Sequence, residues 1–127
     1  VVMFDHSSIV RNISSTRGGG IFGDVRMHGH ARIKGNRAAK KGGGIYGSVR
    51  MHGQARIEGN RAVKGAGAYT FRTLHMGQSA RIVRNSASEK GGGVYLEAGY
   101  QNDPHIIIKS KAAIALNRPD NIFRESD

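Results

Sequence analysis

The sequence contains no cysteine and no tryptophan, and only two of its 127 residues are proline. Without cysteine, disulfide bonds and thiolate metal sites are excluded. No apolar run approaches the length of about 20 residues that spans a membrane, and the triplet Ile106–Ile108 is far too short. Acidic residues are also few: 9 stand against 20 Lys and Arg, giving a formal net charge of +11. This balance favours a polyanionic partner without choosing between nucleic acid, anionic polysaccharide and a charged surface.

Glycine, in contrast, is abundant, at 19 residues. High glycine without proline indicates many tight corners within regular structure rather than a disordered tract. The length of the chain is that of one domain.

The chain repeats itself about every 24 residues. The pattern I-x-x-N places asparagine at positions 12, 36, 60, 85 and 117, with spacings of 24, 24, 25 and 32 residues. A second pattern keeps the same period and reads GGGIF at 18–22, GGGIY at 42–46, GAGAY at 65–69 and GGGVY at 91–95. A third is VRM at 25–27 and 49–51. Several patterns at one period are the mark of a solenoid.

Apolar residues alternate within each repeat. Ile45, Val49 and Met51 share one face, and Tyr46 and Arg50 share the other. Period two predicts strands rather than helices. We therefore expect an all-β, right-handed parallel β-helix of about five coils of about 24 residues, with three short strands per coil. The coils are expected over residues 1–117, followed by a C-terminal tail at 118–127. An antiparallel sandwich is the alternative fold.

Stacked coils should bury like residues on like. The expected inner columns are Met3, Met27, Met51, Met76 and Ile108; Ile9, Ile33, Ile57, Ile82 and Ile114; Ala31, Ala55, Ala80 and Ala112; and Ile21, Ile45, Ala68 and Val94. Two insertions interrupt the period, at Thr70–Leu74 and at Ala98–His105. Such insertions map to surface loops.

At GGGIY together with I-x-G-N, the chain resembles bacterial surface β-helix proteins. The similarity is closest to the Gly-Gly-Ala-Ile and Phe-x-x-Asn repeats of polymorphic outer membrane proteins, and to Gly-rich repeats of secreted adhesin-like proteins. It covers residues 9–117. The resemblance implies a scaffold fold and an extracellular or cell-surface location.

The repeated asparagines form the first candidate site: Asn12, Asn36, Asn60, Asn85 and Asn117. Aligned amides could bind a ligand. An asparagine at a corner can equally bond to its counterpart one coil away, as in the ladders of stacked strands. We favour the structural ladder.

The aromatic residues that follow the glycine runs form the second candidate: Phe22, Tyr46, Tyr69 and Tyr95. They should point outward and stack. An exposed strip of rings could bind sugars or bases, whereas rings one coil apart could also stack on one another. We favour the self-stacking ladder.

Arginines form two outward columns, Arg32, Arg56 and Arg81 in one and Arg26 and Arg50 in the other. Such columns repel unless anions, or carboxylates such as Asp24 and Glu58, lie nearby. They are either a polyanion-binding stripe or a solvated face.

No catalytic or metal site stands out. His28, His30, His52 and His75 lie near one corner, but no carboxylate joins them at matching positions, and turn-exposed histidines are the favoured interpretation. Glycoside hydrolysis needs two carboxylates at a defined separation, and no adjacent pair recurs here. We expect no enzyme activity, no cofactor and no metal.

The favoured function is therefore an extracellular structural or assembly solenoid that packs end to end into a homo-oligomer or filament. The alternative is a surface adhesin-like module that binds an anionic glycan through arginine and aromatic side chains. A polysaccharide lyase-like enzyme is a remote third. Nucleic acid is not the expected partner.

Overall fold

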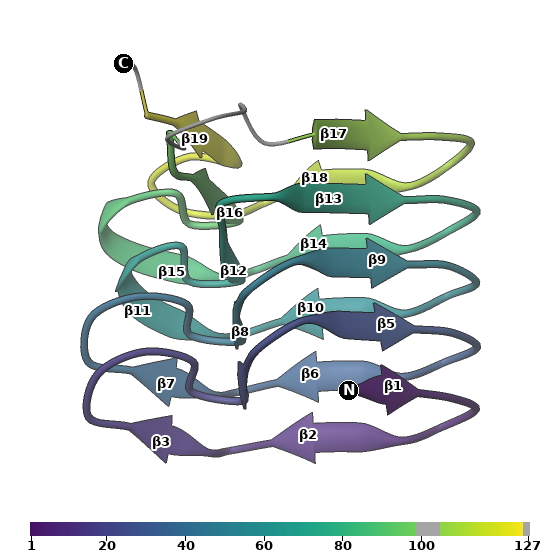
Figure 1. The fold of residues 1–127 in the computed structure, drawn as a ribbon, viewed down its shortest axis with the longest axis horizontal. Helices are drawn as coiled ribbons and strands as arrows, with labels where there is room; N and C mark the ends of the chain where they lie inside the picture. Colours follow the sequence, from purple (N-terminus) through teal and green to yellow (C-terminus); the bar gives the residue numbers. More distant parts are fainter. Residues whose placement is uncertain (99–104, 126–127) are drawn as a thin grey trace.

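A computed structural model of the chain describes residues 1–98 and 105–125. All its regular elements are β-strands, and parallel strands stack in about five turns of a solenoid (Figure 1). The all-β parallel solenoid predicted from the repeat is confirmed. No helix in the described part could cross a membrane.

Four sheets run along the stack. Sheet A contains β1 (Val2–Met3), β5 (Val25–Met27), β9 (Val49–Met51), β13 (Thr73–Met76) and β17 (His105–Ile108). Sheet B contains β2 (Ser8–Val10), β6 (Arg32–Lys34), β10 (Arg56–Glu58), β14 (Arg81–Val83) and β18 (Ala113–Ala115). Sheet C contains β3 (Ile13–Ser14), β7 (Arg37–Ala38), β11 (Arg61–Lys64) and β15 (Ser86–Lys90). Sheet D contains β4 (Ile21–Phe22), β8 (Ile45–Tyr46), β12 (Ala68–Thr70), β16 (Val94–Leu96) and β19 (Ile122–Arg124).

Each full coil thus holds four short strands, and the prediction of three was wrong on this count. The alternating stretch from Ile45 to Met51 is divided between β8 and β9 by a corner at Gly47. Gly47 has φ of +153°, and a Cβ there would collide with the carbonyl of Gly23 in the preceding coil. Only glycine lets the coils approach at this corner, because it carries no side chain.

The strand registers reproduce the predicted inner columns. Met3 pairs with Met27, and Ile57 lies between Ile33 and Ile82. These columns form the main core, except that Ile108, at the end of its column, is 40% exposed. A smaller core of alanines lies at sheet C: Ala38, Ala62, Ala66 and Ala87. Burying each isoleucine or methionine contributes about 1.5–3 kcal/mol, and no single coil could bury them alone.

The two irregular segments and the tail depart from the plain repeat. The first insertion places Phe71 and Arg72 between β12 and β13. Most of the second, residues 99–104, lies outside the described residues. The segment that we set apart as a tail contributes β19, which pairs with β16. The stack therefore continues past Asn117.

Candidate functional site

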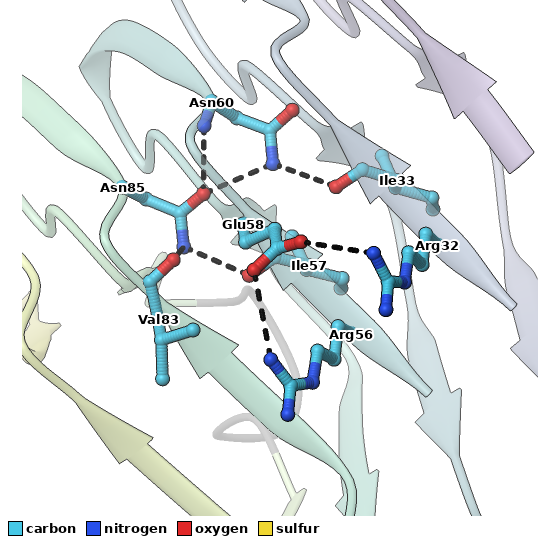
Figure 2. A network of polar contacts seen from close by, with 8 residues as sticks. All are labelled: Arg32, Ile33, Arg56, Ile57, Glu58, Asn60, Val83 and Asn85. Atoms are coloured by element: carbon cyan, nitrogen blue, oxygen red, sulfur yellow. Dashed lines mark hydrogen bonds and ion pairs between the residues drawn. The ribbon is translucent and has the colours of Figure 1, made fainter. Parts of the chain in front are cut away.

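The asparagines form a continuous ladder inside the corner between sheets B and C. In each rung, the backbone N–H and the side-chain Nδ2 of one asparagine both donate to the Oδ1 of the next. For Asn60 and Asn85 both distances are 2.9 Å (Figure 2). The Nδ2 of Asn60 also donates to the carbonyl of Ile33 at 3.1 Å. All predicted members except Asn12 are buried.

The ladder has one member that the sequence did not reveal. Asn121 accepts from the backbone N–H of Asn117 at 3.1 Å and from its Nδ2 at 3.2 Å. It occupies the place of the next rung, although it lies only four residues further along the chain. The 24-residue repeat does not predict Asn121, because this residue follows Asn117 within the same coil. With these contacts the buried amides of the ladder are engaged with one another and with the backbone, which supports the structural interpretation.

The aromatic residues stack in register along sheet D, and Phe123 extends the ladder. Ring centroids of Tyr69 and Tyr95 are 4.7 Å apart, with planes only 6° from parallel. Phe22 and Tyr46 are 5.2 Å apart. The rings are not a uniformly exposed strip: Phe22 is 68% exposed, whereas Tyr69 and Tyr95 are 1% and 4% exposed. A flat ligand could not stack on the middle of this ladder.

A row of cations covers the aromatic ladder, and we did not predict it from the sequence. Its members precede the glycine runs and lie in register, one per coil: Arg17, Lys41, Lys64 and Lys90. Each cation lies over the ring of the next coil, with distances to the ring centroid from 4.6 to 5.7 Å. Such cation–π contacts contribute about 0.5–1 kcal/mol each at exposed sites. The signal was present, since the residue before each glycine run is always basic.

The tyrosine hydroxyls hold two carboxylates at the end of the ladder. The hydroxyl of Tyr69 donates to Glu97 at 3.0 Å, and that of Tyr95 donates to Glu125 at 2.6 Å. Burial, and then the hydrogen bond to Glu125, raises the pKa of Tyr95 to about 12. Burial and Glu97 raise the pKa of Tyr69 as well. Both hydroxyls therefore stay protonated at neutral pH.

The two predicted arginine columns lie on different sheets. Arg32, Arg56 and Arg81 align on sheet B, and Arg26 and Arg50 align on sheet A. Of the two carboxylates predicted to neutralise the arginines, only Glu58, on sheet B, forms ion pairs with them. Glu58 lies 3.8 Å from Arg32 and 3.9 Å from Arg56 (Figure 2).

Asp24, the other proposed counter-charge, accepts from the backbone N–H of Ser48 instead, at 2.9 Å. The Arg26 column continues with His75, whose pKa is lowered by burial and then by Arg50. The polyanion-binding role of both arginine columns stays a prediction.

A third arginine column, also missed from the sequence, runs along sheet C. Arg37 pairs with Arg61, and Arg61 pairs with Ser86, which forms a bridge with Arg118. The 24-residue repeat places Arg37 and Arg61 at equivalent positions, but β7 is only two residues long. A strand this short shows too little alternation to predict that its arginine faces outward.

The histidines stack rather than converge. His28 lies between Phe4 and His52, at 5.1 and 5.7 Å between ring centroids, and His6 stacks on His30 at 4.9 Å. His75 lies within β13 of sheet A, opposite Arg50 of β9. Among the described residues no three His, Asp or Glu side chains are placed to hold a metal ion.

Comparison with known proteins gives one match. Residues 31–48 match the family model of the Chlamydia polymorphic membrane protein repeat. This stretch includes Asn36 and the GGGIY run. No curated protein and no solved structure matches. The repeat match and the parallel solenoid together fit a bacterial surface β-helix repeat protein, in agreement with the resemblance seen in the sequence.

Proposed function

We propose that the chain is a non-enzymatic structural module of a bacterial surface solenoid, and that its coils pack end to end with those of a second copy. The observation that carries the proposal is that the repeated side chains contact one another from coil to coil. Asparagines hydrogen-bond to asparagines, aromatic rings stack on aromatic rings, and a cation of one coil lies over the aromatic ring of the next. The repeat thus supports stiffness along the stack rather than a reaction.

The carboxylates of the described residues support the non-enzymatic part of the proposal. Glu58 lies between two arginines, and Asp24 accepts a backbone N–H. Glu97 and Glu125 each accept from a tyrosine hydroxyl. General acid–base chemistry on a glycoside needs a pair of carboxylates that face the substrate, and these groups are engaged with the fold itself.

The first coil supports the assembly part. β1, β2, β3 and β4 each lie at the end of their sheet, so each pairs with a strand on one side only (Figure 1). Ile13 of β3 is 81% exposed, and Val2 of β1 and Val10 of β2 are exposed as well. In the next coil they are in register with Arg37, Arg26 and Lys34, so they lie on the outer faces of these edge strands. Open strand edges with apolar side chains recruit further strands.

The two ends of the 127-residue stack differ, and in this chain the first coil offers the edge for such packing. At the far end, Asn121 takes the last donors of the asparagine ladder. At the near end, nothing in the described residues donates to the Oδ1 of Asn12. Two identical edges can pair about a two-fold axis, which gives a closed dimer rather than an open fibre.

Sedimentation velocity on the 127-residue chain, over a range of concentrations, tests the proposal. We expect a concentration-dependent dimer. The variant Val10→Lys/Ile13→Lys should be monomeric over the same range, because charges on an edge strand oppose pairing. The matched control is Gln54→Lys/Ser88→Lys, which adds the same charge at exposed positions away from the first coil and should leave the dimer intact.

A wild-type chain that stays monomeric at the highest concentration would overturn the assembly proposal. So would a dimer that both pairs of lysines weaken equally, because the association would then follow net charge rather than the edge.

A further inference from the structure

We propose that the outer surface of sheet C binds an anionic polysaccharide laid along the axis of the solenoid. This surface faces sideways, whereas the edge that we assign to assembly faces along the axis. The inference therefore goes beyond the proposed function and does not depend on it.

The surface is built on the third arginine column. Arg37, Arg61, Ser86 and Arg118 are neighbours in register on successive coils, and all four side chains are exposed. Successive coils of a parallel stack are about 4.8 Å apart. Where Ser86 interrupts the column, Arg84 lies two residues away at the corner, with φ of 55°. Each of these successive coils thus contributes an arginine to the row along the solenoid axis.

The column borders two shallow hollows that meet at Ser86. One, of about 380 Å³, is lined by Arg37 and Arg61 and by small side chains such as Ala39 and Ser88. The other, of about 420 Å³, is lined by Arg84, Leu116 and Arg118. Ser86 lines both. Small residues between the arginines leave space for a chain to lie on the sheet.

Among the described residues, no carboxylate forms an ion pair with the arginines of this surface. Glu89, on β15 of the same sheet, pairs with Lys64 instead, at 4.0 Å. Asp120, close to Arg118 in sequence, accepts instead from the backbone N–H groups of Gly91 and Gly92. On sheet B, by contrast, Glu58 lies between two arginines of the column. An external anion would relieve the repulsion on sheet C that a carboxylate already relieves on sheet B.

The chemistry of the surface fits sulfate and carboxylate groups on a linear sugar chain. Guanidinium forks bind such anions through paired N–H donors. A row of one cation per coil suits a polymer that carries an anion at regular intervals along its length. Single-stranded nucleic acid is bound with aromatic stacking platforms, and no aromatic ring lines either hollow. A polysaccharide partner also agrees with a cell-surface protein.

Binding to heparin, a sulfated polysaccharide, tests the inference, with neutral dextran and a DNA duplex as comparison probes. The variant Arg37→Ser/Arg61→Ser removes two facing arginines of sheet C. The matched control, Arg26→Ser/Arg50→Ser, removes two facing arginines of sheet A and the same net charge. Circular dichroism of both variants checks that the solenoid is intact. Titrations at several salt concentrations then give affinity and its salt dependence.

We expect the chain to bind heparin and not dextran. The sheet C variant should lose about tenfold or more in affinity, as for two charge-assisted hydrogen bonds, together with part of the salt dependence. If sheet C is the site, the sheet A variant should lose less than about threefold, because only the long-range field changes. A larger loss in the sheet A variant would overturn the inference in favour of the Arg26 and Arg50 column predicted from the sequence. Equal losses in the two variants, or none in either, would overturn the inference. Tighter, sheet C-dependent binding of the DNA duplex would overturn it too, because the surface would then be a nucleic-acid site.

Discussion

Asn85 shows how much of the structure depends on single side chains. Its Oδ1 accepts from the backbone N–H and the Nδ2 of Asn60, and its own Nδ2 donates to Asn117 and to two backbone carbonyls. These groups are buried, so water cannot replace a lost partner. A buried donor left without an acceptor costs about 1–3 kcal/mol.

We therefore expect Asn85→Ala to lower the free energy of unfolding by about 2–4 kcal/mol. The matched control is Asn12→Ala: Asn12 is exposed at the first rung, and its loss should cost less than about 1 kcal/mol. Urea unfolding followed by circular dichroism measures both. Similar losses in the two variants would mean that the ladder is not held by its buried hydrogen bonds.

At this scale the sequence predicted the members of the ladders better than their surroundings. The period placed five asparagines and four aromatic residues at the same point of their repeats, and in the structure each set lies in register from coil to coil. It did not reveal that Tyr69 is buried, since the cover comes partly from Lys41 of the preceding coil. Glu97 and Glu125 were missed for a related reason: they meet the tyrosines only after the coils stack.

At the scale of the strand, the corners decide the shape of the coil. Gly47 lies between β8 and β9, and a Cβ on it would meet the carbonyl of Gly23 in the coil before. Gly23 holds the same place in the first coil, with a similar φ of +140°, but a Cβ on it meets nothing within 4 Å. The two glycines share the unusual backbone conformation and differ in whether a coil lies against them.

This difference gives a prediction that separates backbone conformation from packing. Both Gly47→Ala and Gly23→Ala carry the strain of an alanine at positive φ. Only Gly47→Ala also forces two coils apart, and we expect it to be less stable than Gly23→Ala by about 1–3 kcal/mol. Thermal and urea unfolding compare them. Equal destabilisation would show that the conformation alone requires glycine at these corners.

The same corner explains why the number of strands could not be predicted. Alternation continues through Gly47, so the pattern from Ile45 to Met51 is that of one strand. The change of direction leaves no mark on the pattern, because glycine has no side chain to place on either face. What the alternation did predict correctly is the inward set, since Ile45, Val49 and Met51 are all fully buried.

At the scale of the whole molecule, the solenoid behaves as a sum of equivalent coils. Columns of like residues keep their register from coil to coil, and the described strands pair with strands of the neighbouring coils. Stability in such a stack is approximately a sum of coil and interface contributions. The register of the columns, rather than the number of residues, should therefore decide whether the chain folds.

Removing one whole coil tests this directly. Deleting residues 30–53 joins Gly29 to Gln54, and Gln54 follows Gly53, the equivalent of Gly29, in the intact chain. All columns stay in register, so we expect a folded solenoid whose urea m-value is smaller by about a fifth, because m follows the surface exposed on unfolding. Deleting only residues 30–41 removes half as many residues but takes away Ile33 and Asn36 and shifts the columns against one another. This shorter deletion should abolish cooperative unfolding and the strand signal in circular dichroism. If instead the whole-coil deletion is the more damaging of the two, the coils are not equivalent units, and the rigid-stack basis of the proposed function fails.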